Sequence, residues 1–137
     1  MPKNIRSRAR RLDPPVIIGN AKVIKGAGRG RRMDVPTLNL DIAAVPRDLA
    51  HGIYACEIAF QKRRFMGAMH FGPRPVFDAP ESFEIHVLDW KGEKPPQKVD
   101  LRIVARIREI KNFSDVVLLK AAIAEDIQAV RAILGRA

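Results

Sequence analysis

Six short segments rich in β-branched and aromatic residues follow one another along most of the chain, and this succession constrains the fold most strongly. Short connections containing Gly, Pro or charged residues separate them, and the briefest, Gln61-Lys62-Arg63, predicts a hairpin. A parallel sheet would need helices between its strands, and these connections leave no room for them. We therefore predict antiparallel strands. They cover residues 16–25, 37–42, 52–60, 64–71, 83–90 and 99–110.

The pattern changes after Ser114, where apolar residues begin to recur at the spacing of one helix face. Ser114 is a predicted N-cap and Gly135 a predicted stop, so we expect a helix over about residues 114–134. Six short strands followed by one amphipathic helix predict a mostly β protein, a small antiparallel barrel with the helix packed against it.

The 137 residues contain no internal repeat and no low-complexity linker, so we expect one domain over residues 16–137. The net charge of +10 is concentrated at the amino-terminal end, where residues 1–32 hold ten Lys or Arg and one acid. Part of that charge lies in residues 1–15, which we expect to form a basic, flexible tail.

The composition also bears on the compartment. No apolar run approaches the ~20 residues of a membrane span, and the basic start lacks the apolar stretch of a secretory signal. The single cysteine, Cys56, permits no internal disulfide. These features predict a cytoplasmic protein without a membrane segment.

Residues 26–32 read GAGRGRR, a run in which glycines alternate with other residues. Glycines let the backbone approach a ligand closely, and the arginines favour an anion such as a polyphosphate. The run matches neither the P-loop pattern nor a dinucleotide fingerprint, because no helix follows it. It therefore predicts either a phosphate-binding loop or a flexible basic turn.

Thr37 and Asn39 lie two apart in a predicted strand, so their side chains share one face. A hydroxyl and a carboxamide oxygen suit Mg²⁺ when nucleotide phosphates complete its coordination. Alternatively, both side chains only hydrogen-bond the turn after Pro36.

In the segment FEIHVLD, Phe83, Ile85 and Val87 share one face of a strand, and Glu84 and His86 share the other. Glu84 is a candidate general base for a hydroxyl, although most strand glutamates are simply solvated. The three histidines have no metal-ligand spacing, so no zinc site is expected.

From about Ile17 to Leu134 the chain resembles the riboflavin kinase module of bacterial and eukaryotic flavokinases, including the carboxy-terminal part of bifunctional FAD synthetases. The resemblance lies in the order and spacing of GAGRGR, PTLN (36–39), GIYACEI, FGPRPVF (71–77), EIHVLD (84–89) and IREIKNFSD (107–115). It implies a six-stranded Greek-key barrel. It also implies transfer of a phosphate from ATP to the ribityl 5′-hydroxyl of riboflavin, giving FMN and ADP.

The same resemblance implies the cofactor Mg²⁺, with Zn²⁺ or Mn²⁺ as alternatives, and riboflavin and ATP as ligands. We also expect a monomer, and the few aromatic residues argue against nucleic acid as a partner. The resemblance assigns Glu84 as the catalytic base. The residues that it assigns to ligands are Gly26, Gly28, Arg29, Gly30, Arg32 and Thr37 for the nucleotide, Thr37 and Asn39 for the metal, and Arg108, Lys111 and Phe113 for the flavin.

Two other functions stay open at this point. Asp34, an acid beside the predicted phosphate site, motivates a flavin-binding module with impaired catalysis, because a carboxylate there repels phosphate. The basic amino-terminal end motivates a small RNA-binding barrel.

Overall fold

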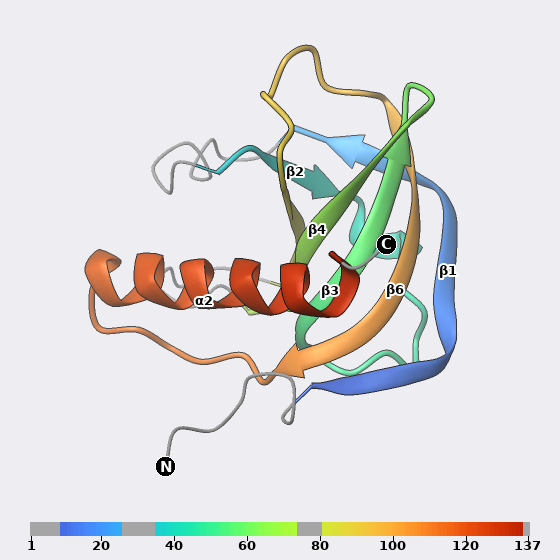
Figure 1. The fold of residues 1–137 in the computed structure, drawn as a ribbon. Helices are drawn as coiled ribbons and strands as arrows, with labels where there is room; N and C mark the ends of the chain where they lie inside the picture. The colour runs from blue at the N-terminus through green and yellow to red at the C-terminus, as the bar shows by residue number, and fades with distance from the viewer. Residues whose placement is uncertain (1–8, 26–34, 74–80, 136–137) are drawn as a thin grey trace.

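The computed structural model describes residues 9–25, 35–73 and 81–135, and over these residues six antiparallel strands close into a barrel (Figure 1). The strand order around the barrel is β1-β2-β5-β4-β3-β6, which confirms the predicted mostly β barrel with a carboxy-terminal helix. The elements are β1 (Arg10–Ile24), β2 (Thr37–Leu40), a short 3-10 helix η2 (Ile42–Ala44), β3 (Gly52–Phe60), β4 (Arg63–Gly72), β5 (Ser82–Val87), β6 (Lys98–Arg108) and α2 (Val116–Leu134).

The hairpin between β3 and β4 forms where the short connection predicts it. Its pairing runs without a break from Gly52 opposite Phe71 to Phe60 opposite Arg63. The two residues between the strands, Gln61 and Lys62, have positive φ angles of 52° and 62°. A two-residue turn with both residues in the left-handed region matches the twist of the strands that it joins.

The first strand begins earlier than expected, so the assignment of residues 1–15 to a flexible tail is wrong for residues 10–15. Arg10 and Arg11 pair with β6, and after a shift in register the pairing resumes at Val16. Leu12 packs against the interior core between these two paired stretches. Pro14 and Pro15 do not end the strand, because pairing with β6 is interrupted at them and resumes beyond them. Residues 1–8 lie outside the described residues.

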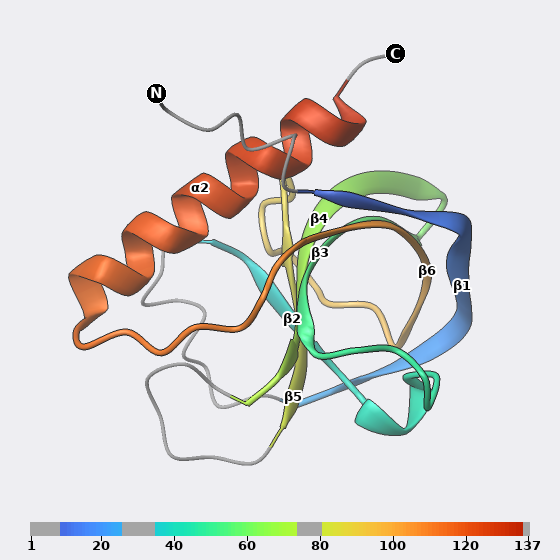
Figure 2. The same cartoon turned by 90° about the horizontal axis from the view of Figure 1, so that it is seen from below.

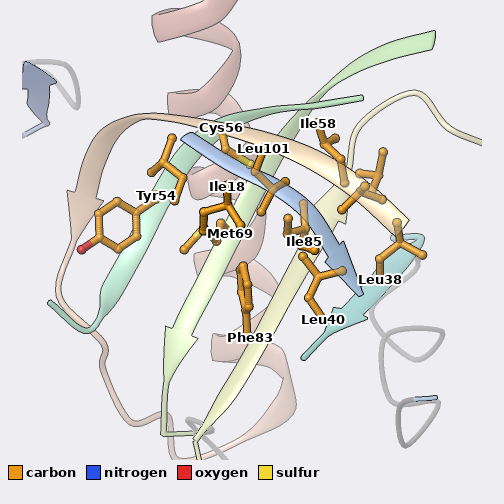
Figure 3. Close-up of a cluster of buried hydrophobic side chains, with 14 of the residues drawn as sticks. Ile18, Leu38, Leu40, Tyr54, Cys56, Ile58, Met69, Phe83, Ile85 and Leu101 are labelled. Atoms are coloured by element: carbon orange, nitrogen blue, oxygen red, sulfur yellow. The ribbon is translucent and has the colours of Figure 1, made fainter. Parts of the chain in front are cut away.

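The barrel interior is filled by apolar side chains, as Figure 3 shows for one part of it. Leu38, Met69 and Ile85 contribute from three adjacent strands, and each is at most 2% exposed. Their neighbours along each strand point outward, as the alternation of a strand requires. A ligand therefore has no room inside this barrel, and any binding site must use its outer face or its ends.

Helix α2 packs on the outside of the barrel, against β4, β3 and β6 (Figure 2). Beneath it Ala68, Ala55 and Ala105 are directly opposite one another on these strands, and their small side chains let the helix approach the sheet. Ala129 and Val130 from the carboxy-terminal half of the helix complete this second cluster.

The helix begins at Val116, two residues after Ser114, and its N-cap is Asp115 rather than Ser114. The Asp115 carboxylate accepts a hydrogen bond of 2.9 Å from the backbone N–H of Leu118. Gly135 follows the last turn, as predicted. Within the described ranges, α2 and every other helical segment is too short or too polar to cross a bilayer.

Candidate functional site

Four polar residues share the outer face of β2 and β5. Thr37 is directly opposite His86, and Asn39 is directly opposite Glu84. Directly opposite side chains on neighbouring strands lie about 5 Å apart at their Cβ atoms. All four residues are partly buried, whereas Leu38 between Thr37 and Asn39 points into the core. The common face predicted for Thr37 and Asn39 is present, and Glu84 lies beside it.

The Thr37 hydroxyl has two close partners. It donates a hydrogen bond of 3.0 Å to the backbone carbonyl of Val35, and its oxygen lies 2.8 Å from Nδ1 of His86. Burial lowers the pKa of His86 below its ordinary value, and a weaker opposing effect comes from the neighbouring Glu84 carboxylate. Burial thus favours the neutral form of the His86 imidazole.

A second row of residues crosses five strands of the outer face. Asn39 is opposite Glu84, Glu84 opposite His70, His70 opposite Ile53, and Ile53 opposite Arg108. At ~4.8 Å between neighbouring strands, Glu84 and Arg108 are about 14 Å apart along this row. His70 is 9% exposed, and its Nδ1 lies 3.2 Å from the hydroxyl of Ser82. The row connects the predicted base with the predicted flavin residues.

Arg108 at the end of β6 is held by an ion pair to helix α2. Its Nε and one terminal nitrogen each donate a hydrogen bond of 2.7 Å to the carboxylate of Asp126. The guanidinium carbon lies 5.9 Å from the centre of the Phe113 ring. Burial raises the pKa of Asp126, and the opposing effects of Arg108 and of the Lys111 charge do not cancel it. Arg108 thus connects Asp126 with Phe113, and the Lys111 charge acts on the same carboxylate.

The predicted site residues fall into two groups and a remainder. Thr37, Asn39 and Glu84 come together on β2 and β5, and the flavin set surrounds the junction of β6 and α2. The remaining predicted residues lie outside the described ranges, so their placement stays a prediction. They are Gly26, Gly28, Arg29, Gly30 and Arg32.

Sequence reasoning missed the contacts of His86, His70 and Asp126. For His86 the signal was present, because strand alternation puts it on the same face as Glu84. No such signal points to His70 or to Asp126, because their contacts are with residues distant in sequence. His70 contacts Ser82 on β5, and Asp126 contacts Arg108 on β6.

The oxygen donors of Thr37 and Asn39 fit a hard divalent cation such as Mg²⁺, which prefers oxygen ligands and keeps several waters. Both side chains rise from one face of β2, and a carboxylate stands directly opposite Asn39. Among residues 9–25, 35–73 and 81–135, no group of three or more His, Cys, Asp or Glu is arranged to hold a metal. A cation at this face would therefore depend on the hydroxyl, the carboxamide and oxygens of a bound ligand.

Comparison with known proteins identifies the class to which this barrel belongs. The family model Flavokinase, described as riboflavin kinase, matches residues 15–134. The fold also matches the crystal structure of riboflavin kinase from Trypanosoma brucei, with a TM-score of 0.56 at 19% identity over 88% of this chain and 80% of that one. The chain belongs to the riboflavin kinase family.

Relatives of known name are distant in sequence. The bifunctional riboflavin kinase/FMN adenylyltransferase of Pseudomonas fluorescens is 26% identical over 82% of this chain and 36% of its own length. The RNA-binding riboflavin kinase RibR of Bacillus subtilis (strain 168) is 28% identical over 79% of this chain and 47% of its own length. The chain thus spans less than half the length of these relatives.

A second solved structure shares the fold. It is titled macrolide-efflux protein from Streptococcus pneumoniae, and it matches with a TM-score of 0.68 at 24% identity over 85% of this chain and 38% of that one.

Proposed function

We propose that this protein is a riboflavin kinase that transfers the γ-phosphate of ATP to the ribityl 5′-hydroxyl of riboflavin, giving FMN and ADP. Membership of the family supports the reaction class. The observation that carries the proposal is the row on the outer face, in which Glu84 has Asn39 on one side and leads through His70 toward Arg108 on the other. His70 and Ile53 in the middle of the row are only 9% and 6% exposed, so in this proposal an elongated substrate spans the distance from Glu84 to Arg108 over them rather than contacting every residue of the row.

In this proposal Glu84 orients the 5′-hydroxyl and accepts its proton as the oxygen attacks the γ-phosphorus. The new bond joins the ribityl oxygen to phosphorus, and the bond between phosphorus and the β,γ-bridging oxygen breaks to release ADP. Little covalent work is left for the protein, so positioning and charge stabilisation account for most of the catalysis.

Thr37 and Asn39 would hold Mg²⁺ through their side-chain oxygens. When bound, such a cation neutralises negative charge on the phosphates. The glycine and arginine segment is assigned to the phosphates on sequence grounds. It joins β1 to β2, and the pairing of Ile24 with Asn39 brings both described ends of that segment to the same side of the barrel. Arg108, Lys111 and Phe113 are assigned to the flavin, and Arg108 lies about three strands away from Glu84 along the row.

The test uses the full chain, incubated with riboflavin, Mg²⁺ and one nucleoside triphosphate at a time. Chromatography then separates riboflavin from FMN. We expect ATP to support FMN formation. Glu84→Gln should lower the rate about 10²- to 10⁴-fold, which is the usual contribution of general base catalysis.

Glu57→Gln is the matched control, because Glu57 is also a strand glutamate but pairs with Arg102 outside the row. It should leave the rate within about twofold, as expected for a residue that contacts neither substrate. A Glu84→Gln variant that folds normally and keeps most of its rate would remove the base assignment. Riboflavin binding without any phosphate transfer would favour the impaired flavin-binding module instead.

RNA binding is a second candidate, which one structural feature favours. Lys22 on β1 is directly opposite Lys98 on β6, so two like charges are neighbours on this part of the barrel. Like charges directly opposite each other are destabilising, and a polyanion relieves this repulsion. The relative from Bacillus subtilis is named an RNA-binding riboflavin kinase. Fluorescence anisotropy with labelled RNA tests the idea, and binding that Lys98→Glu leaves unchanged would argue against this face.

A further inference from the structure

The Thr37 hydroxyl takes part in two hydrogen bonds but carries only one hydrogen. One contact, 3.0 Å long, is to the Val35 carbonyl, which can only accept. The other, 2.8 Å long, is to Nδ1 of His86, which accepts or donates according to the tautomer of the ring. The two contacts together are both satisfied by only one tautomer of the neutral ring.

If His86 carried its proton on Nε2, Nδ1 would be an acceptor. The hydroxyl hydrogen would then be donated either to the Val35 carbonyl or to Nδ1 of His86. In the other contact two acceptors would face each other with no hydrogen between them. With the proton on Nδ1, both contacts are satisfied, because the hydroxyl donates to Val35 and accepts from His86. The hydroxyl oxygen has two lone pairs, so this arrangement leaves one of them unused.

We propose that His86 is a positioning residue whose Nδ1–H fixes the Thr37 hydroxyl so that its remaining lone pair is available to a divalent cation. This inference rests on the proposed function, in which Thr37 and Asn39 hold that cation. His86 acts through Thr37 and need not touch either substrate. Partners that orient a metal ligand in this way commonly change metal affinity about 10- to 100-fold when they are removed.

The tautomer is measurable in the protein without any ligand. Long-range ¹H–¹⁵N correlation spectra of the ¹⁵N-labelled full chain distinguish a protonated Nδ1 from a protonated Nε2. The chain has three histidines, so the spectrum of His86→Asn identifies the signals of His86. We expect protonated Nδ1 in the wild type. In Thr37→Val, which lacks the hydroxyl, we expect the proton to move mainly to Nε2, and a wild-type ring protonated on Nε2 would overturn the inference.

The consequence for the cation is measured with Mn²⁺ as the probe, titrated by electron paramagnetic resonance in the presence of ADP. His86→Leu should weaken Mn²⁺ binding about 10-fold. His86→Asn should stay within about threefold of the wild type, because its amide N–H can take the position of Nδ1–H. The matched control is His51→Leu, which removes a half-exposed histidine elsewhere and should have no effect.

A double variant separates positioning from a general structural role. If His86 acts through Thr37, adding His86→Leu to Thr37→Val should cause no further loss of Mn²⁺ affinity. Independent, multiplying losses would overturn the inference, as would unchanged affinity in His86→Leu. Should His86→Leu fail to fold, the spectra of the wild type and of Thr37→Val still show which nitrogen of His86 carries the proton and whether Thr37 determines it.

Neither measurement requires phosphate transfer, so the two proposals fail separately. Absence of FMN formation together with protonated Nδ1 and weakened Mn²⁺ binding in His86→Leu would overturn the proposed function alone. FMN formation by a wild type with protonated Nε2 would overturn this inference alone.

Discussion

The ion pair between Arg108 and Asp126 joins the end of β6 to helix α2, and removing one partner should cost more than removing both. The side chains are 20% and 7% exposed, and the two bonds between them are each 2.7 Å long. Burial nevertheless raises the pKa of Asp126, so Arg108 does not fully offset the loss of hydration of the carboxylate.

Arg108→Met leaves the Asp126 carboxylate buried without its partner. Breaking a buried pair in this way costs about 3–5 kcal/mol, and we expect about 3 because the arginine is partly exposed. Asp126→Leu should cost about 1.5 kcal/mol, since the remaining arginine can extend toward water. The double variant should lose about 1 kcal/mol or less, because apolar side chains of similar volume replace a buried pair at little cost.

Urea unfolding measures these differences, with the fluorescence of Trp90 as the probe. Trp90 is the single tryptophan and is 4% exposed in the folded chain, so its emission should change on unfolding. In Arg108→Met the Asp126 pKa lies further above its unfolded value of about 3.9 than in the wild type. The folded variant then binds more protons than the unfolded chain, so its stability falls as pH rises through that window, by at most about 1.4 kcal/mol per pH unit.

Arg108→Met should accordingly recover part of its lost stability at pH 5 relative to pH 7.5. The reasoning is refuted if this variant lies within about 0.5 kcal/mol of the wild type at pH 7.5, or if the double variant is as unstable as both single losses combined. The double variant also isolates the flavin role predicted for Arg108. If it is stable and yet binds riboflavin about 10-fold more weakly than Asp126→Leu by fluorescence titration, the guanidinium contributes to the ligand directly.

Three further predictions follow from packing and chemistry elsewhere. A Cβ added at Gly67 would lie 2.7 Å from Ile85 Cγ2 and 3.2 Å from Cys56 Sγ, so Gly67→Ala should lower the free energy of unfolding in urea by about 1–3 kcal/mol, and an unchanged value would contradict this close packing. Burial raises the pKa of Cys56 to about 12, so the native thiol should not react with Ellman's reagent at pH 8 until the chain is unfolded, and immediate reaction would contradict its burial. Asn39→Leu should raise the Mg²⁺ concentration for half-maximal FMN formation by about 10-fold while riboflavin affinity stays within threefold, and an unchanged Mg²⁺ requirement would remove Asn39 from the cation site.

Local sequence patterns predicted the bounds of an element well where a single residue type marks its start or end. The strand at 52–60 has its predicted bounds, because a glycine begins it and a two-residue turn ends it. The helix start was placed at Ser114 although Asp115 is the cap. Serine and aspartate are both favourable caps, so local preference does not choose between adjacent candidates. The start of β1 was missed because prolines normally end strands, whereas here pairing with β6 resumes beyond them.

The site was predictable to the same extent. Alternation along β2 and β5 put Thr37 and Asn39 on one face, and Glu84 on one face with His86. The contact between Thr37 and His86 joins residues 49 apart in sequence, and that between Arg108 and Asp126 joins residues 18 apart. Such contacts depend on the register of the closed barrel and on where the helix packs. A single sequence does not specify either of these.

The filled interior explains why the outer face of this barrel carries the candidate chemistry. A closed barrel of six strands has room only for its own side chains, and the Leu38, Met69 and Ile85 side chains occupy it. Substrates must therefore bind where outward-facing residues are left uncovered by the helix. The small side chains of Ala55, Ala68 and Ala105 let α2 pack closely on β3, β4 and β6. The neighbouring outward-facing positions on β2 and β5 are polar and partly exposed. Alternation along the strands thus fills the core and also separates the surface covered by the helix from the polar positions on β2 and β5, which is why Thr37, Asn39 and Glu84 lie beside the helix rather than beneath it.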